Sequence, residues 1–100
     1  DLTQVWAVFV DKRLRAAFLT SLHDLHDSKE RVLDIYGLGG EGAPKWGREL
    51  SEVMAAFASA NGCSRFTFAG KPGWERICGG TVKAVGTRDN GHVQFERAVA

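Results

Sequence analysis

The sequence predicts a single α+β domain: a twisted mixed β-sheet with one main crossover helix and a short second helix. Three observations lead there. Runs of β-branched and aromatic residues alternate with short polar breaks, as strands joined by turns do. One long stretch carries apolar residues at helical spacing, and an Asn-Gly pair near the end marks a hairpin. A chain of 100 residues suits one domain.

Composition and charge exclude several classes of protein. Hydrophobic residues make up 44% of the chain and charged residues 25%, as in ordinary soluble globular domains. The formal net charge is +1, so the basic footprint of a nucleic-acid-binding protein is missing. No apolar run is long enough to span a bilayer, and we expect no membrane partner. The first residues lack a signal peptide's features, which favours a cytoplasmic location in a bacterial cell.

Cys63 and Cys78 are the only cysteines. Neither a Cys-x-x-Cys pair nor a histidine at ligand spacing accompanies them, which argues against zinc and against a disulfide framework. We expect two reduced, partly buried thiols.

The first third of the chain predicts three strands. Apart from Gln4, residues 4–10 are continuously apolar, which is typical of a strand covered on both faces. Residues 11–13 form a polar break short enough for a hairpin turn, so residues 14–22 should return antiparallel. The charged segment 23–30 then reads as a loop that leads to a third strand, residues 31–37.

The clearest element is a helix after the third strand. Its apolar residues recur at helical spacing and form one stripe: Trp46, Leu50, Val53, Met54 and Phe57. Pro44 suits the first turn, because its missing N–H is not needed there. Asn61-Gly62 supplies the left-handed residue that ends the helix.

The last third predicts a strand, a short helix and a hairpin. Residues 63–70 alternate, with Phe66 and Phe68 on one face. The main helix joins this strand to residues 31–37 as a right-handed crossover, so the two strands should run parallel. Residues 71–80 can hold only a short helix, and residues 81–100 form a hairpin around Asn90-Gly91, with Val93, Phe95 and Val99 on one face.

This order of elements, with a glycine-bearing turn before the main helix, resembles the GNAT superfamily of N-acetyltransferases. Residues 47–68, GRELSEVMAAFASANGCSRFTF, are similar to the family's central helix and following strand, and residues 73–80, GWERICGG, take the place of its short second helix. The resemblance covers nearly all of residues 1–100 and implies that the family's N-terminal strand and first helix pair are missing. The chain is also similar to small acetyltransferase-like proteins of tailed phages and prophages.

The family's cofactor loop, Q/R-x-x-G-x-G/A, points backbone N–H groups at the pyrophosphate of acyl-CoA from a helix N-terminus. Residues 37–50, GLGGEGAPKWGREL, hold five glycines at the corresponding place. The pattern sets Gly47 at the final glycine, Lys45 at the first and Gly42 at the Gln/Arg position, so one position in three matches. Pro44 removes a donor N–H, and Trp46 crowds the cradle.

Two interpretations of this loop stay open. In the first, Lys45 and Arg48 supply side-chain charge to a phosphate, or the glycines form the cradle in a shifted register. The candidate residues for acetyl-CoA are then Gly39, Gly40, Gly42, Lys45, Trp46, Gly47 and Arg48. In the second, the glycines only shape a strand-to-helix bend in a degenerate member of the family.

Acetyl transfer to an amine needs a base and an acid. The resemblance implies a carboxylate on a central strand and a tyrosine at the short helix, but Trp74 stands in that helix and an indole N–H cannot serve as the acid. Asp34 and Tyr36 point to the same face of the third strand and are the catalytic candidates. The alternative for Asp34 is a solvated carboxylate paired with an arginine.

The segment HDLHD, residues 23–27, could gather around a metal. His-x-x-His places both rings on one side only in a helix, and this segment follows a strand. We therefore expect a solvated turn and no metal.

Three functions stay open at this point. The first is a degenerate GNAT-fold protein, phage- or prophage-encoded, with lost or altered catalysis. The second is an active acyl-CoA-dependent N-acetyltransferase, with the acyl-CoA in a wedge-shaped opening where residues 31–37 and 63–70 diverge. The third is a non-catalytic, virion-associated or protein-binding module, which self-associates or binds virion proteins through a sheet edge or the terminal hairpin.

Overall fold

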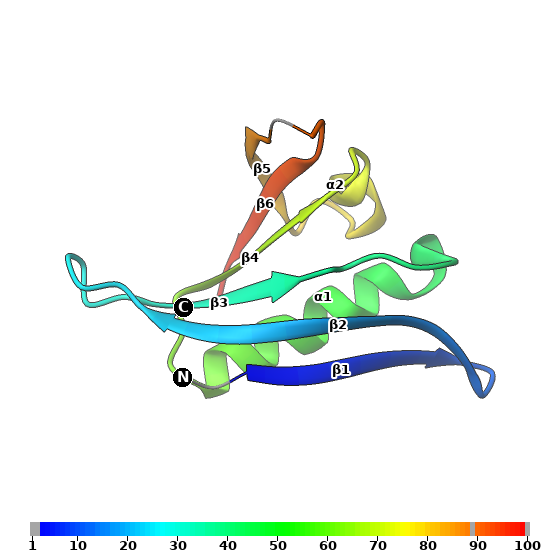
Figure 1. Cartoon of the computed structure of the whole chain (residues 1–100), viewed down its shortest axis with the longest axis horizontal. Coiled ribbons are helices and arrows are strands. Elements are labelled where there is room, and N and C mark those ends of the chain that lie inside the picture. The colour runs from blue at the N-terminus through cyan, green and yellow to red at the C-terminus, as the bar shows by residue number, and fades with distance from the viewer. Residues whose placement is uncertain (1–2, 89, 100) are drawn as a thin grey trace.

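The computed structural model describes residues 3–88 and 90–99. A six-stranded sheet has the strand order β1-β2-β3-β4-β6-β5, and α1 crosses one of its faces (Figure 1). The elements in chain order are β1 (Thr3–Val10), β2 (Arg13–Asp24), β3 (Arg31–Tyr36), α1 (Ala43–Ala60), β4 (Arg65–Gly70), α2 (Trp74–Ile77), β5 (Lys83–Thr87) and β6 (Val93–Ala98). This order confirms the predicted α+β fold.

The first hairpin turns on two residues. Val10 pairs with Arg13, and Asp11 and Lys12 between them have φ values of 52° and 65°. Positive φ at both central residues is the mark of a type I′ turn, whose twist matches that of the strands. The predicted antiparallel return is confirmed.

The predicted loop at residues 23–30 is wrong at its start. β2 continues through His23 and Asp24, which pair with Val32 and Arg31 of β3. The Arg31 guanidinium donates to both carboxylate oxygens of Asp24, at 2.8 and 3.4 Å, so the polar end of the strand is held by an ion pair instead of apolar packing. The turn itself is shorter, and the Leu25 N–H donates to the Glu30 carbonyl at 2.7 Å.

β3 and β4 run parallel, as predicted, on either side of the crossover through α1. Their pairing begins at Val32 with Arg65 and ends at Ile35 with Phe68. Beyond that point the ribbons of β3 and β4 diverge, as Figure 1 shows. The predicted separation of the two strands therefore begins at their carboxyl ends.

The core lies between the sheet and α1. Met54 and Ala58 of α1 are almost fully buried against Leu33, Phe66 and Phe95 of the sheet. The predicted apolar stripe is wrong at one position, because the side chain of Val53 is 44% exposed. Gly47 and Ser51 are buried instead, because α1 faces α2 as well as the sheet.

The end of α1 and the terminal hairpin follow the prediction. The Asn61 side chain donates to the Phe57 carbonyl at 2.8 Å, and Gly62 takes a φ of 76°. In the hairpin, the Arg88 N–H donates to the His92 carbonyl at 2.8 Å. The remaining residues of the predicted hairpin, Asp89 and Ala100, lie outside the described residues.

Gln4 to Val10 were predicted to form a strand covered on both faces, and this is wrong. β1 is an edge strand, and its Val5 and Phe9 side chains are 77% and 63% exposed. Both cysteines are free and more deeply buried than predicted. Within residues 3–88 and 90–99 no helix is both long and apolar enough to cross a membrane.

Candidate functional site

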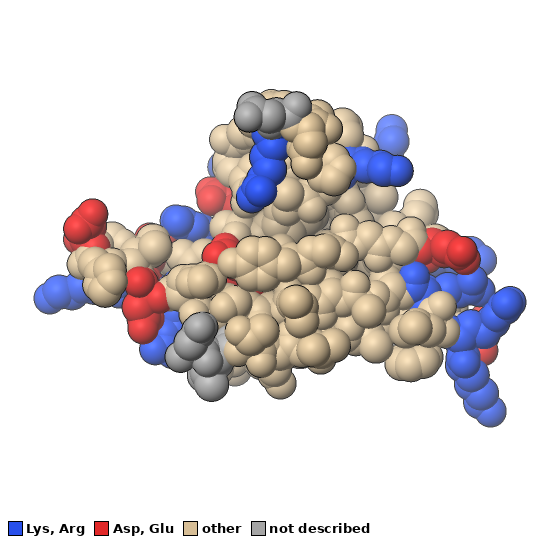
Figure 2. Space-filling view, viewed as in Figure 1, with Lys and Arg blue, Asp and Glu red and all other residues tan. Residues whose placement is uncertain are grey.

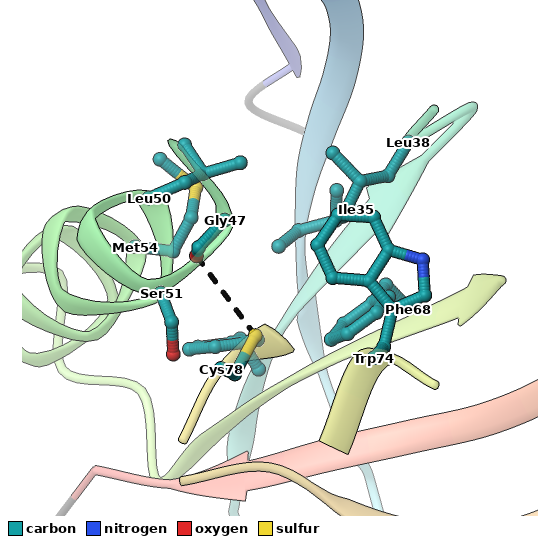
Figure 3. A pocket seen from close by; sticks show the side chains of 10 residues that line it. Ile35, Leu38, Gly47, Leu50, Ser51, Met54, Phe68, Trp74 and Cys78 are labelled. Carbon is teal, nitrogen blue, oxygen red and sulfur yellow. Dashed lines mark hydrogen bonds between the residues drawn. The ribbon is translucent and has the colours of Figure 1, made fainter. Parts of the chain in front are cut away.

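The wedge between the ends of β3 and β4 is lined mainly by apolar side chains from four elements, β3, β4, α1 and α2, and from the loops beside them. The lining residues are Ile35, Leu38, Gly47, Leu50, Ser51, Met54, Phe66, Phe68, Trp74 and Cys78. The Trp74 indole packs edge-on against Phe68, with ring centroids 5.5 Å apart (Figure 3). The cavity between these side chains measures about 10 Å³, so it is nearly filled in this conformation.

Gly47 lets α1 approach α2 and so closes one wall of the wedge. A Cβ at this position would lie 2.4 Å from Cγ2 of Ile77 and 3.1 Å from the Trp74 ring. Gly70 plays the same part on β4, because a Cβ there would lie 2.8 Å from the Trp74 indole. Helix packing accounts for the glycine at 47, which the family pattern assigned to the cofactor.

The glycine loop runs against β2. A Cβ on Gly40 would lie 2.3 Å from the Arg15 carbonyl, and the N–H of Glu41 donates to that same carbonyl at 3.1 Å. Gly42, with a φ of 72°, is the N-cap of α1, while Gly39 has open space around its Cα. Two of the candidate glycines therefore serve the bend and its contact with β2.

Few backbone donors remain at the start of α1. Pro44 has no N–H, and the Lys45 N–H donates to the Gly42 carbonyl at 2.8 Å. The Trp46 side chain is buried under the loop, where its indole N–H donates to the Glu41 carbonyl at 2.7 Å. Pro44 and the hydrogen bond of Lys45 therefore take two backbone donors away from the cradle of the family pattern.

A cationic groove lies beside this helix start. It measures about 550 Å³ and is lined by Pro44, Lys45, Arg48, Pro72, Gly73, Arg76 and Ile77. Three of these residues are cationic, and among the described lining residues none is acidic. The Arg48 guanidinium packs over Gly79, where a Cβ would lie 2.3 Å from its Nη2. The groove thus joins α1 to α2 with positive charge from both.

Asp34 and Tyr36 meet in a cluster that includes one residue the prediction had assigned to a loop. His23 Nε2 lies 3.1 Å from Asp34 Oδ2 and 3.1 Å from the Tyr36 hydroxyl. The Tyr36 hydroxyl donates to Asp34 Oδ2 at 3.3 Å, and the Thr67 hydroxyl donates to Oδ1. The cluster occupies the sheet face opposite α1, and Asp34 pairs with Thr67 one position before the last β3–β4 pair.

Tyr36 keeps its proton near neutral pH. Partial burial, the Asp34 charge and the hydrogen bond to Asp34 together raise the pKa of the Tyr36 phenol above its ordinary value, and the Arg88 charge opposes this. The Arg88 guanidinium, directly after β5, donates to Gln94 Oε1 at 2.8 and 3.1 Å. The phenol is thus available as a proton donor.

The remaining candidates are dispersed. Within residues 3–88 and 90–99, no group of three or more His, Cys, Asp and Glu side chains is placed to hold a metal ion. Cys78 lies in the wedge wall, where its thiol donates to the Gly47 carbonyl at 3.8 Å (Figure 3). Burial raises the pKa of the Cys78 thiol, so it is protonated at neutral pH.

His23 is the member of this cluster that sequence reasoning missed. Its alternation with Ser21 and Leu19 along β2, towards the face that carries Asp34, was the available signal. The charged residues after it masked that alternation.

The mixed sheet, the parallel β3–β4 pair and the diverging tips define a GNAT-like fold. The chain is similar in structure to FeeM, an N-acyl amino acid synthase from uncultured soil microbes, with a TM-score of 0.65 and 9% sequence identity. The match covers 97% of this chain and 72% of FeeM. No protein-family profile and no curated protein sequence matches the chain. The likeness concerns the fold.

Proposed function

We propose that this domain binds an acyl thioester of coenzyme A and transfers its acyl group to an amine. The observation that carries the proposal is the meeting of His23, Asp34 and Tyr36 where β3 and β4 part. Acyl transfer to an amine needs a base and an acid at one place, and this cluster holds both. The GNAT-like fold supports the same class of reaction.

The phosphates of the thioester carrier would bind through side chains. Lys45, Arg48 and Arg76 line one open groove beside the start of α1. Guanidinium groups pair with phosphate oxygens through two parallel hydrogen bonds, so they can replace backbone donors. Binding through side chains differs from the backbone cradle of the GNAT family. In this sense the loop is degenerate, although the protein still binds the phosphates.

The wedge suits the apolar part of the substrate, the acyl chain and its thioester arm. Its lining is apolar, but about 10 Å³ of free space admits no chain until a side chain moves. The Trp74 side chain is the one that we expect to move, because its ring fills the space between Phe68, Gly70 and Gly47. Substrate entry therefore requires a rotation of the Trp74 side chain.

The bound thioester supplies the activated acyl group. His23 takes a proton from the incoming ammonium at its free ring nitrogen, while Asp34 orients the ring and stabilises the imidazolium. The amine nitrogen forms its bond to the acyl carbon, the carbon–sulfur bond breaks, and the Tyr36 phenol donates its proton to the leaving thiolate. The second proton of the nitrogen passes to the tyrosinate as the neutral amide forms, which restores the Tyr36 phenol, and His23 releases the ammonium proton to solvent.

The acceptor we favour is an apolar amino acid. A shallow groove of about 300 Å³ adjoins Tyr36 and is lined on β2 by Ala17 and Leu19. The positive charge of Arg88 acts on the same tyrosine, and a guanidinium can pair with the carboxylate of an amino acid. The neighbour FeeM is named as an N-acyl amino acid synthase, which makes free amino acids the first acceptors to try.

The test incubates the protein with acyl-CoAs of increasing chain length and a panel of amines that includes apolar amino acids. Thiol release and the mass of the acylated product are the measurements. We expect His23→Gln to lower the rate at least about 100-fold. His26→Gln, in the exposed turn after β2, is the matched control and should leave the rate unchanged. No product from any pair, together with no CoA binding by calorimetry, would contradict the proposal.

The second candidate is a non-catalytic binding module of phage or prophage origin. Large apolar side chains exposed on β1 and β2, among them Phe9 and Leu14, favour it. It predicts no acyl transfer with any substrate, a stable partner in pull-downs, and a gene that lies among capsid and tail genes. A gene in a metabolic operon and a measurable transferase rate would exclude it.

A further inference from the structure

The Trp74 ring reaches across the wedge from α1 to β4. Its six-membered ring faces Gly47, where a Cβ would lie 3.1 Å from Cζ3, and its five-membered ring faces Gly70, where a Cβ would lie 2.8 Å from Nε1. The centroids of Phe68 and Trp46 lie 5.5 and 6.0 Å from that of Trp74. The residue is 6% exposed. The ring therefore closes the wedge between α1 and β4.

Packing alone holds the Trp74 ring in this place. Among the residues that the structure describes, its indole N–H has no hydrogen-bond partner, whereas Trp6 donates to the Thr20 hydroxyl at 2.9 Å and Trp46 to the Glu41 carbonyl at 2.7 Å. In Figure 3 the nitrogen of Trp74 lies on the side of the ring turned away from α1. A ring without such a bond can move without leaving a buried polar partner unpaired. Trp74 is therefore the tryptophan whose displacement breaks no hydrogen bond.

The wedge ends against side chains that are fixed in the core. Met54 lies further along α1 than Gly47, and Phe66 lies further from the tip of β4 than Gly70. Both Met54 and Phe66 are 1% exposed and belong to the core cluster. A close-packed core does not take up added methylene groups without strain. A guest in the wedge therefore gains the space of the Trp74 ring and little more.

The wedge and the His23 cluster lie on opposite faces of the sheet. Ile35 and Phe68 form the last pair of β3 and β4, and both line the wedge on the face that α1 covers. Asp34 and Tyr36 point to the other face. Figure 2 shows that face, where charged side chains gather mainly at the ends of β1, β2 and β3. A thioester held where the two strands diverge can therefore turn its acyl chain to one face and meet the amine at the other.

We propose that a straight, unsubstituted acyl chain of about six to eight carbons takes the place of the Trp74 ring, so that this residue selects the length of the acyl group. The inference rests on the proposed acyl transfer and names its donor. A chain of about this length has roughly the bulk of the side chain that it displaces, and it restores close packing. The Ser51 hydroxyl in the lining already has Thr81 and Arg97 as partners, at 3.1 and 2.9 Å, so a hydrocarbon chain leaves it satisfied.

Chain length should change the affinity in two directions. Each buried methylene group strengthens binding about fourfold, until the space of the Trp74 ring is filled. An acetyl group is too short to fill that space, so it gains nothing from displacing the ring. A chain much longer than about eight carbons meets Met54 and Phe66 and forces the core apart. The preferred donor is therefore an acyl thioester of medium length.

The first test is calorimetric titration, without amine, with acyl-CoAs of about two to about twelve carbons. The affinity of the wild type should rise from butanoyl-CoA to octanoyl-CoA and then fall. Trp74→Ala should bind octanoyl-CoA about tenfold more tightly than the wild type, because no ring has to leave, and acetyl-CoA equally well. Trp6→Ala, which removes an indole that packs against Phe18 and Phe57 instead, is the matched control and should bind like the wild type. Circular dichroism checks the fold, and Trp74→Phe should show the same direction with a smaller gain.

The second test uses the wild type and needs no CoA. The NMR signal of the Trp74 indole N–H, assigned by its loss in Trp74→Phe, should shift with 1-hexanol at concentrations where ethanol leaves it unchanged. A signal that 1-hexanol does not move would overturn the proposal, and so would equal affinities for acetyl-CoA and octanoyl-CoA. If 1-hexanol moves the signal and no acyl-CoA binds, the chain pocket under Trp74 is supported and the proposed acyl transfer is contradicted. The two failures are therefore distinct.

Discussion

His23 Nε2 lies 3.1 Å from Asp34 Oδ2, across two antiparallel strands whose turn separates them in the sequence. The register explains the contact. Asp34 pairs with Ser21 and His23 pairs with Val32, so the imidazole and the carboxylate are diagonal neighbours on one face of the sheet. The Thr67 hydroxyl fixes the other carboxylate oxygen from β4. The site is therefore held by three strands.

Asp34→Asn should lower acyl transfer about 10²- to 10⁴-fold, because the amide neither orients the His23 ring nor stabilises the imidazolium. The measurement is the initial rate of thiol release at saturating acyl-CoA. Asp27→Asn, in the exposed turn after β2, is the control and should leave the rate unchanged. If Asp34→Asn keeps the full rate, the Asp34 carboxylate takes no part in acyl transfer.

Arg48→Gln and Arg76→Gln should each weaken CoA binding about 3- to 10-fold, because each removes one partner of a phosphate in an open groove. Calorimetric titration with CoA measures the effect, and the loss should shrink at high salt. Binding of an acyl-pantetheine without the nucleotide phosphates should not change. Arg13→Gln, at the start of β2, is the matched control, because it also removes one positive charge. Equal weakening by Arg13→Gln would show a general charge effect instead of a site.

Gly47→Ala should destabilise the fold by about 1 to 2 kcal/mol, although the same change inside an exposed helix stabilises by about 1 kcal/mol. The new Cβ would lie 2.4 Å from Ile77 Cγ2, so α1 and α2 must move apart. Urea unfolding measures the change, and adding Ile77→Ala should recover part of it. Gly39→Ala, where nothing lies within 4 Å of the new Cβ, should be close to neutral. A stable Gly47→Ala protein that no longer binds CoA would show that Gly47 serves cofactor binding and not helix packing.

Glu52→Gln should make the free energy of unfolding depend less on pH in the acidic range. Arg97 donates to both Glu52 oxygens, at 2.6 and 3.3 Å, and this hydrogen bonding with its charge lowers the pKa of Glu52 below its ordinary 4.5. A pKa lowered in the folded state contributes stability above the unfolded pKa, and this contribution is lost as the pH falls through the folded value. Urea midpoints between about pH 3 and pH 7 measure it, with Glu49→Gln on the same helix as control. Parallel profiles for Glu52→Gln and the wild type would refute the pairing.

Much of the fold follows from short-range patterns in the sequence. The two-residue turn at Asp11 and Lys12, the end of α1 at Asn61, and the alternation of Phe66 and Phe68 all depend on neighbours within a few residues. The parallel pairing of β3 and β4 follows from the crossover helix between them. These features could be predicted because backbone geometry and local hydrogen bonds decide them.

The candidate site could be predicted only in part. Asp34 and Tyr36 share a face because they are two residues apart on one strand. The third member, His23, depends on how far β2 extends and on its register with β3. Gly47 was assigned to a phosphate by its place in a motif, yet its neighbours are Ile77 and Trp74 of α2. A motif gives positions along the chain, and it does not say which face of the helix meets another element.

The sequence by itself determined the order of the elements, where most of them turn, and which two strands run parallel, because periodicity and turn chemistry act over a few residues. Only the tertiary structure decided that β1 lies outermost among the described strands, that Val53 is exposed, and that His23 contacts Asp34. Those relations depend on strand register and on the approach of α1 to its neighbours. Both are set by the packing of the whole core, in which every contact competes with many others.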